Sequence, residues 1–72
     1  MDTDDGPLTD DDVDDIVADV ISFHADDMRC WKEQLKGRTL AHWRAMVTAY
    51  SKTLSPGDVE RVATACWHRA ES

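Results

Sequence analysis

Five carboxylates are spaced so that they would lie in one row if residues 9–35 formed a single helix. At about 100° per residue, the four aspartates of this set fall within about 60° of one another, and the glutamate continues their line. The set consists of Asp12, Asp15, Asp19, Asp26 and Glu33. Such a row either meets the lysines and arginines of a partner or forms a solvated surface. It is the first candidate for a functional site.

Histidine and cysteine are also present, but their spacing does not indicate a metal site. His24 and Cys30 are six residues apart and Cys66 and His68 are two apart, so neither pair shares a helix face as residues three or four apart would. The aspartates lack the alternating ligands and central glycine of a calcium-binding loop. We therefore expect neither a metal nor another cofactor.

His24 and Asp27 lie three residues apart on the apolar side of this segment. Two structural interpretations are open: the helix breaks at residues 24–27, or it continues and the two side chains pair at the edge of the core. A catalytic His–Asp pair is a third interpretation, but no serine or cysteine nucleophile lies on that face. The sequence therefore predicts no enzymatic activity.

Charge is divided unevenly along the 72-residue chain, whose formal net charge is −7. Residues 1–27 contain eleven aspartates and no lysine or arginine, which gives −11. Residues 28–72 contain eight lysines and arginines against four acidic residues, which gives +4. A protein that used acidic residues only to hold water would spread them over its whole surface, so this division favours a binding partner.

Hydrophobic periodicity predicts an all-α fold, a small three-helix bundle with a long first helix. This helix spans residues 9–35, with Thr9 as its N-cap and Gly37 after its end, and it is open to the break described above. Its core stripe consists of Val13, Ile16, Val17, Val20, Met28, Trp31 and Leu35. The second helix is predicted from the cap Thr39, and the third from Ser55, which precedes a proline.

Composition places these helices in one domain. Residues 1–8 are acidic and unable to bury apolar area, which predicts a flexible tail, and residues 9–72 form the single helical domain. No apolar stretch approaches the roughly 18 residues of a membrane span. The acidic start is unlike a signal peptide, so we expect a cytoplasmic protein with reduced thiols.

The second and third helices could form a helix-turn-helix that binds DNA. The third helix would read bases with Arg61, Thr64 and His68, while Arg69, Arg38, Arg44 and Lys52 would meet phosphates. The net charge opposes this hypothesis, and Glu60 and Glu71 flank the proposed reading face. Direct nucleic-acid binding is therefore the alternative rather than the preferred hypothesis.

The acidic row favours mimicry of a nucleic acid. From Asp12 to Glu33 a continuous helix would extend about 30 Å, enough to place carboxylates along a basic groove built for a nucleic-acid backbone. In size and charge the chain is similar to phage and plasmid counter-defence proteins such as the anti-CRISPRs. We therefore predict an inhibitor or modulator that binds a protein with a basic groove, for example in a nucleic-acid-handling complex.

A helical adaptor or homodimer is a third hypothesis. Aromatic side chains in so short a chain could remain uncovered and anchor a partner; the candidates are Trp43, Tyr50 and Trp67. The alanines Ala41, Ala45 and Ala49 lie on one side of the second helix, where a second copy could approach. High helix propensity on an exposed face explains the same alanines equally simply.

Overall fold

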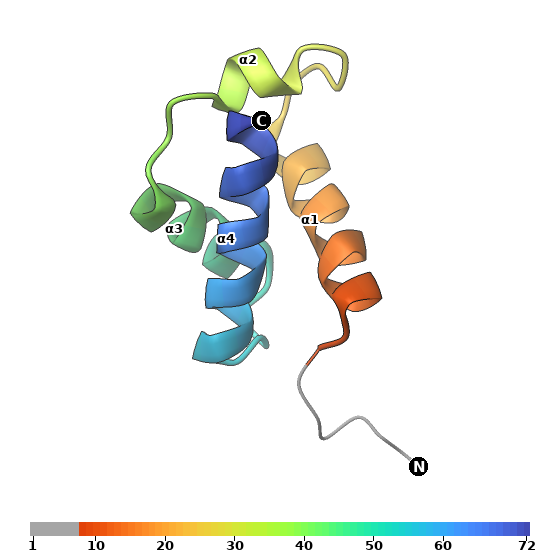
Figure 1. Cartoon of the computed structure of the whole chain (residues 1–72), viewed down its shortest axis with the longest axis vertical. Helices are drawn as coiled ribbons and strands as arrows, with labels where there is room; N and C mark the ends of the chain where they lie inside the picture. Colours follow the sequence, from red (N-terminus) through yellow and green to blue (C-terminus); the bar gives the residue numbers. More distant parts are fainter. Residues whose placement is uncertain (1–7) are drawn as a thin grey trace.

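The structure, a computed structural model, describes residues 8–72. Within that range the chain forms four helices and no strand: α1 (Asp10–His24), α2 (Trp31–Leu35), α3 (Leu40–Tyr50) and α4 (Pro56–Glu71). Figure 1 shows α1 and α4 side by side and running in the same direction, with α2 at the end where both finish. None of these helices is long and apolar enough to cross a membrane. The predicted all-α bundle is confirmed, and the first helix is divided in two.

The predicted starts of three helices are confirmed by their caps. The Thr9 hydroxyl accepts a hydrogen bond from the backbone N–H of Asp12 at 3.1 Å, and the Asp12 carboxylate accepts one from the N–H of Thr9 at 3.3 Å. The hydroxyls of Thr39 and Ser55 each accept from the N–H three residues later, at 3.2 Å. After α2, Gly37 has a φ of +87°, which glycine adopts readily because it has no Cβ.

The α1 helix ends at His24, and the residues after it make hydrogen bonds to side chains in place of helical ones. The N–H of Asp26 donates to Oε1 of Gln34 at 2.7 Å, and the Asp27 carboxylate accepts from the N–H of Arg29 at 2.9 Å. The broken helix is therefore the correct interpretation, and a continuous helix over residues 9–35 is wrong.

The break also separates His24 from Asp27, which do not pair. Nε2 of His24 lies 3.0 Å from the carbonyl oxygen of Met46, so the imidazole ties the end of α1 to α3. Met28, predicted in the core, is 50% exposed because the chain after the break no longer follows the apolar stripe of α1.

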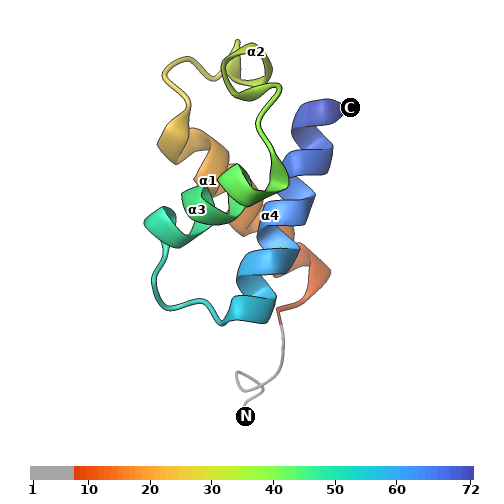
Figure 2. The ribbon, with the colours of Figure 1, turned by 90° about the vertical axis from the view of Figure 1, so that its left-hand side faces the viewer.

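The core lies where α1, α3 and α4 meet. Figure 2 shows α3 covering one side of the α1–α4 pair. The buried side chains are Val13, Val17, Val20, Ile21, Leu35, Trp43, Met46, Val47, Val62, Ala63, Cys66 and Ala70. Trp43, which the sequence suggested as a surface anchor, has no exposed area and is the largest fully buried side chain, so that suggestion is wrong.

The predicted acidic tail lies outside the described residues, with the exception of Leu8. Leu8 packs against the core, and its carbonyl oxygen accepts a hydrogen bond from Nη1 of Arg61 on α4. The entry of the chain into α1 is therefore tied to α4.

Candidate functional site

The aspartates of α1 fall into two groups that differ in what surrounds them. Asp10 and Asp14 face α4, and we call them the paired flank. The other group consists of Asp11, Asp12, Asp15 and Asp19; all four are exposed, and we call them the outer acidic face. The buried valines and Ile21 occupy the remaining side of the helix and fix its orientation against the core.

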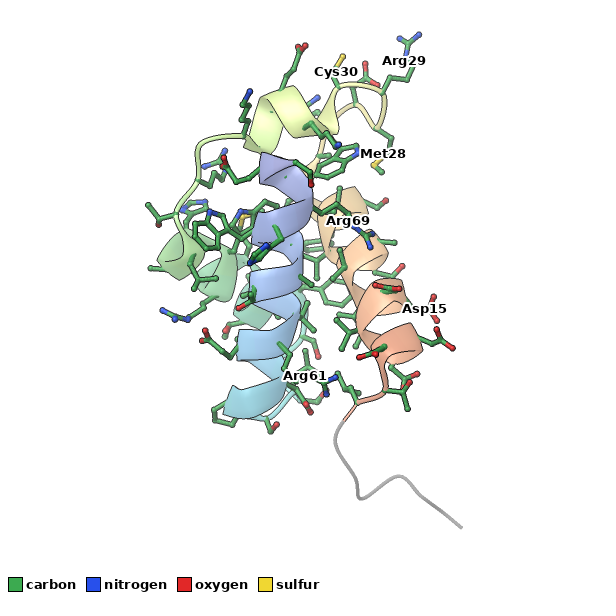
Figure 3. The ribbon with its side chains drawn as sticks, in the orientation of Figure 1. Asp15, Met28, Arg29, Cys30, Arg61 and Arg69 are labelled. Carbon is green, nitrogen blue, oxygen red and sulfur yellow. The ribbon has the colours of Figure 1, made fainter. Side chains whose placement is uncertain are left out.

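The paired flank forms two solvent-exposed ion pairs with arginines of α4. Nη2 of Arg61 lies 3.6 Å from Oδ1 of Asp10, and Nη2 of Arg69 lies 3.3 Å from Oδ1 of Asp14. Figure 3 shows both arginines directed from α4 towards α1. The first pair joins the start of α1 to the N-terminal half of α4, and the second joins Asp14, in the second turn of α1, to the last turn of α4.

In the part of the chain that the structure describes, the outer acidic face has no such cations. Within residues 8–72, no lysine or arginine forms an ion pair with any of its four carboxylates. Asp15 points away from the bundle into solvent (Figure 3). Asp11 and Asp15 are three or four residues from other aspartates on the same helix, so these carboxylates repel one another. The helix dipole favours Asp11, which lies in the first turn, but not Asp15, which lies beyond it.

Two carboxylates of the outer acidic face accept hydrogen bonds from uncharged donors rather than from a lysine or arginine. Asp12 accepts from the backbone of Thr9, as described above. Asp19 accepts a hydrogen bond from the phenolic hydroxyl of Tyr50 on α3 at 3.0 Å. This hydrogen bond, with burial and the Asp19 charge as smaller causes, raises the pKa of Tyr50 above its ordinary value.

The mean charge density of the outer acidic face along the helix axis is close to that along a nucleic-acid strand. From Asp11 to Asp19 the helix rises about 12 Å, and the successive carboxylates are about 1.5, 4.5 and 6 Å apart along the axis, a mean of about 4 Å. One strand of duplex DNA carries a phosphate about every 3.4 Å of axis. The two linear charge densities are therefore similar.

Asp26 and Glu33 do not extend this face. Asp26 lies in the loop after α1, and Glu33 is on α2, which lies by the C-terminal end of α4 in Figure 1. The prediction of one row of about 30 Å depended on a continuous helix. The break shortens the row to the part that α1 carries.

An exposed aromatic ring stands at the C-terminal end of the same face. Phe23 is 63% exposed, the highest value among the large hydrophobic side chains of the described range. Its ring makes edge contacts with His24, at 5.0 Å between centroids, and with Tyr50, at 5.8 Å. Phe23 was not among the predicted site residues, although its spacing from Asp12 and Asp19, by eleven and four residues, places all three on one stripe of a helix.

The residues of the DNA-binding hypothesis do not form an open cationic surface. Arg61 and Arg69 are held by the paired flank. Thr64 is half-buried and His68 is exposed, with its ring against Trp67. Of the predicted phosphate contacts, Arg44 makes a two-pronged hydrogen bond to Glu60, at 2.5 and 3.0 Å, which lowers the pKa of that carboxyl.

Other parts of the surface carry fewer features that suggest chemistry. A shallow groove between the end of α3 and the start of α4 is lined partly by Arg44 and Glu60, which already bind each other. Within residues 8–72, no group of three or more His, Cys, Asp or Glu residues is arranged to hold a metal ion. The alanines of the dimer hypothesis, Ala41, Ala45 and Ala49, are exposed on α3.

Comparison of the chain with protein-family models, with curated proteins and with solved structures gives no match.

Proposed function

We propose that this protein is an inhibitor or modulator that binds a basic groove on a nucleic-acid-handling protein. The outer acidic face of α1 would occupy the groove in place of a nucleic-acid backbone. The observation that carries the proposal is the division of α1: the arginines of α4 are used on Asp10 and Asp14, while the outer acidic face has no cation within residues 8–72. A face of unopposed like charges costs stability, and a basic partner would remove that cost.

The same division weakens the alternative hypothesis of a DNA-binding regulator. If Arg61 and Arg69 turned to phosphates, the exposed carboxylates of Asp10 and Asp14 would lose their cations and repel the DNA. Mimicry needs no rearrangement of the fold. The likeness in size and charge to phage and plasmid counter-defence proteins supports the same proposal.

A charge-matched pair of double variants tests the proposal. Asp11→Asn with Asp15→Asn removes two charges from the outer acidic face, and Asp26→Asn with Glu33→Gln removes two charges elsewhere. Both variants have the same net charge. We expect the first to weaken partner binding by about tenfold or more and the second to leave it nearly unchanged.

The measurement is capture of partners on the tagged protein from a lysate of the source cells, with and without nuclease, followed by affinity measurement on the purified partner. A basic protein that survives nuclease and is lost only with the first variant supports mimicry. Recovery of DNA, or of proteins only through DNA, would support the regulator instead. Equal loss of partner binding with both variants would mean that binding depends on the net charge of the protein and not on the outer acidic face.

A further inference from the structure

Phe23 is exposed but held in place. The edge contacts that its ring makes with His24 and Tyr50 are themselves anchored, because His24 binds the Met46 carbonyl and Tyr50 binds Asp19. A ring restrained in this way loses little conformational freedom when a partner covers it. Such an aromatic side chain is suited to act as a binding anchor.

The surroundings of the ring limit the chemistry of its partner. Asp19 lies one helical turn before Phe23 on the same side of α1, and the rest of the outer acidic face continues from it. Any pocket that takes the ring would therefore lie beside the side chains that meet these carboxylates. By charge complementarity, those side chains are lysines and arginines.

We infer, on the basis of the proposed function, that the partner's groove is one that binds single-stranded nucleic acid, with Phe23 in the place of a base and the outer acidic face in the place of phosphates. Grooves for single strands combine a cationic track with aromatic side chains on which bases stack. The ligand of such a groove has negative charges along a backbone and a ring that stacks. The outer acidic face supplies the charges, and the exposed ring of Phe23 at its end takes the place of a base.

A groove for duplex DNA fits less well. In a duplex the faces of the bases are stacked on one another, and only their edges are accessible in the grooves. A protein surface shaped for the duplex backbone has no place for the face of a ring at the end of a charged row. The exposed ring of Phe23 therefore favours a groove for single-stranded nucleic acid over one for duplex DNA.

The test uses proteins of the source cells bound to two resins, one carrying single-stranded and one carrying double-stranded DNA. Each resin is challenged with the wild-type protein, with Phe23→Leu, which keeps an apolar side chain but cannot stack, and with Phe23→Tyr, which can stack. Met28→Leu alters another exposed apolar residue, outside α1, and serves as the control. Circular dichroism and thermal unfolding verify that each variant is folded.

We expect the wild type to release a protein from the single-stranded resin but not from the double-stranded one. Phe23→Leu should need about tenfold more protein for the same release, while Phe23→Tyr and Met28→Leu should act as the wild type does. Equal release from both resins, absence of release, or full activity of Phe23→Leu would each overturn the inference.

The charge variant distinguishes failure of the inference from failure of the proposed function. If Asp11→Asn with Asp15→Asn abolishes release and Phe23→Leu does not, the carboxylates bind the partner and the ring does not, so only the inference fails. If the charge variant binds and releases partners as the wild type does, the proposed function fails as well.

Discussion

The two groups of aspartates on α1 have the same chemistry and opposite surroundings. Asp10 and Asp14 lie against Arg61 and Arg69, whereas the outer acidic face meets only solvent and uncharged donors within residues 8–72. The six aspartates of α1 therefore do not form one uniform acidic surface. The two of the paired flank form ion pairs with α4, and the four of the outer acidic face have no cation within residues 8–72.

This difference shows that the number of charged residues in a segment does not identify which surface binds a partner. The positive charge of residues 28–72 suggests a surface for nucleic acid, yet the arginines on α4 that would build it are internal partners of α1. A charged binding face is formed by the side chains that have no oppositely charged partner within the folded protein. Five experiments test the difference between the two groups of aspartates.

The largest effect is expected from Ile21→Ala. This change weakens the packing of α1 against the core, and with it the arrangement that places only Asp10 and Asp14 beside α4. Ile21 is 2% exposed, and truncation of such a residue costs about 2–4 kcal/mol of unfolding free energy. Chemical denaturation measures the loss, with the exposed Ser22→Ala as the control. A loss below about 1 kcal/mol would mean that the ion pairs, rather than burial, hold α1.

Thiol labelling would show whether α1 opens in that variant. Burial raises the pKa of the Cys66 thiol to about 12, so this thiol is both shielded and protonated at neutral pH, while Cys30 is exposed. In a Cys30→Ser background, we expect Cys66 to react only on unfolding in the wild type and much faster in Ile21→Ala. Equal rates would contradict opening of the core.

A smaller effect is expected from removing the arginines of the paired flank. Arg61→Met keeps the apolar stem but loses the contacts to Asp10 and to the Leu8 carbonyl, which should cost about 1 kcal/mol. Arg69→Met loses one exposed ion pair and should cost a few tenths, about 0.3 kcal/mol. Thermal unfolding of both variants checks the order; a reversed order would show that the Leu8 contact does not contribute.

Single aspartate variants should change stability by different amounts. Asp15→Asn relieves repulsion from Asp11 and Asp19 and should stabilise the fold by about 0.2–0.5 kcal/mol. Asp14→Asn relieves similar repulsion from Asp10 and Asp11 but loses the pair with Arg69, so it should leave stability nearly unchanged. The difference between the two variants should shrink as salt screens the charges. If both variants destabilise the fold equally, the two groups do not differ.

The smallest effect concerns Tyr50, the only tyrosine of the chain, which absorbance of the tyrosinate ion reports directly. Its pKa should be above the ordinary value near 10, chiefly through the hydrogen bond to Asp19, and Asp19→Asn should lower it. Because the folded-state pKa is the higher one, the contact stabilises the fold fully below about pH 10 and less as pH rises through the folded-state pKa. The same pKa in urea and in buffer would contradict the contact.

Local features of the fold were predictable from the sequence. Thr9, Thr39 and Ser55 cap helices, and Gly37 follows one, because such positions depend on residues within one turn. The all-α bundle follows from hydrophobic periodicity in the same way.

Features that depend on distant residues were not predictable. The break after α1 needs Gln34 to accept from Asp26, eight residues earlier, and His24 needs a carbonyl of α3. Asp26 and Glu33 left the acidic row for this reason. The pairs that neutralise the paired flank join residues more than fifty positions apart. By contrast, the position of Phe23 beside the carboxylates was predictable from its spacing alone. It was missed because the helical wheel was used to identify core residues, and Phe23 does not lie on the core stripe.

The parallel arrangement of α1 and α4 has a consequence for the order of folding. Asp14 and Arg69 are 55 residues apart, whereas Arg44 and Glu60, which join α3 to α4, are 16 apart. Closing the longer loop costs about 1 kcal/mol more in chain entropy. We therefore expect the α3–α4 pair to form first and α1 to dock last. A partner that binds only docked α1 would secure the helix that joins the fold latest, so its binding and the folding of the chain would be thermodynamically linked.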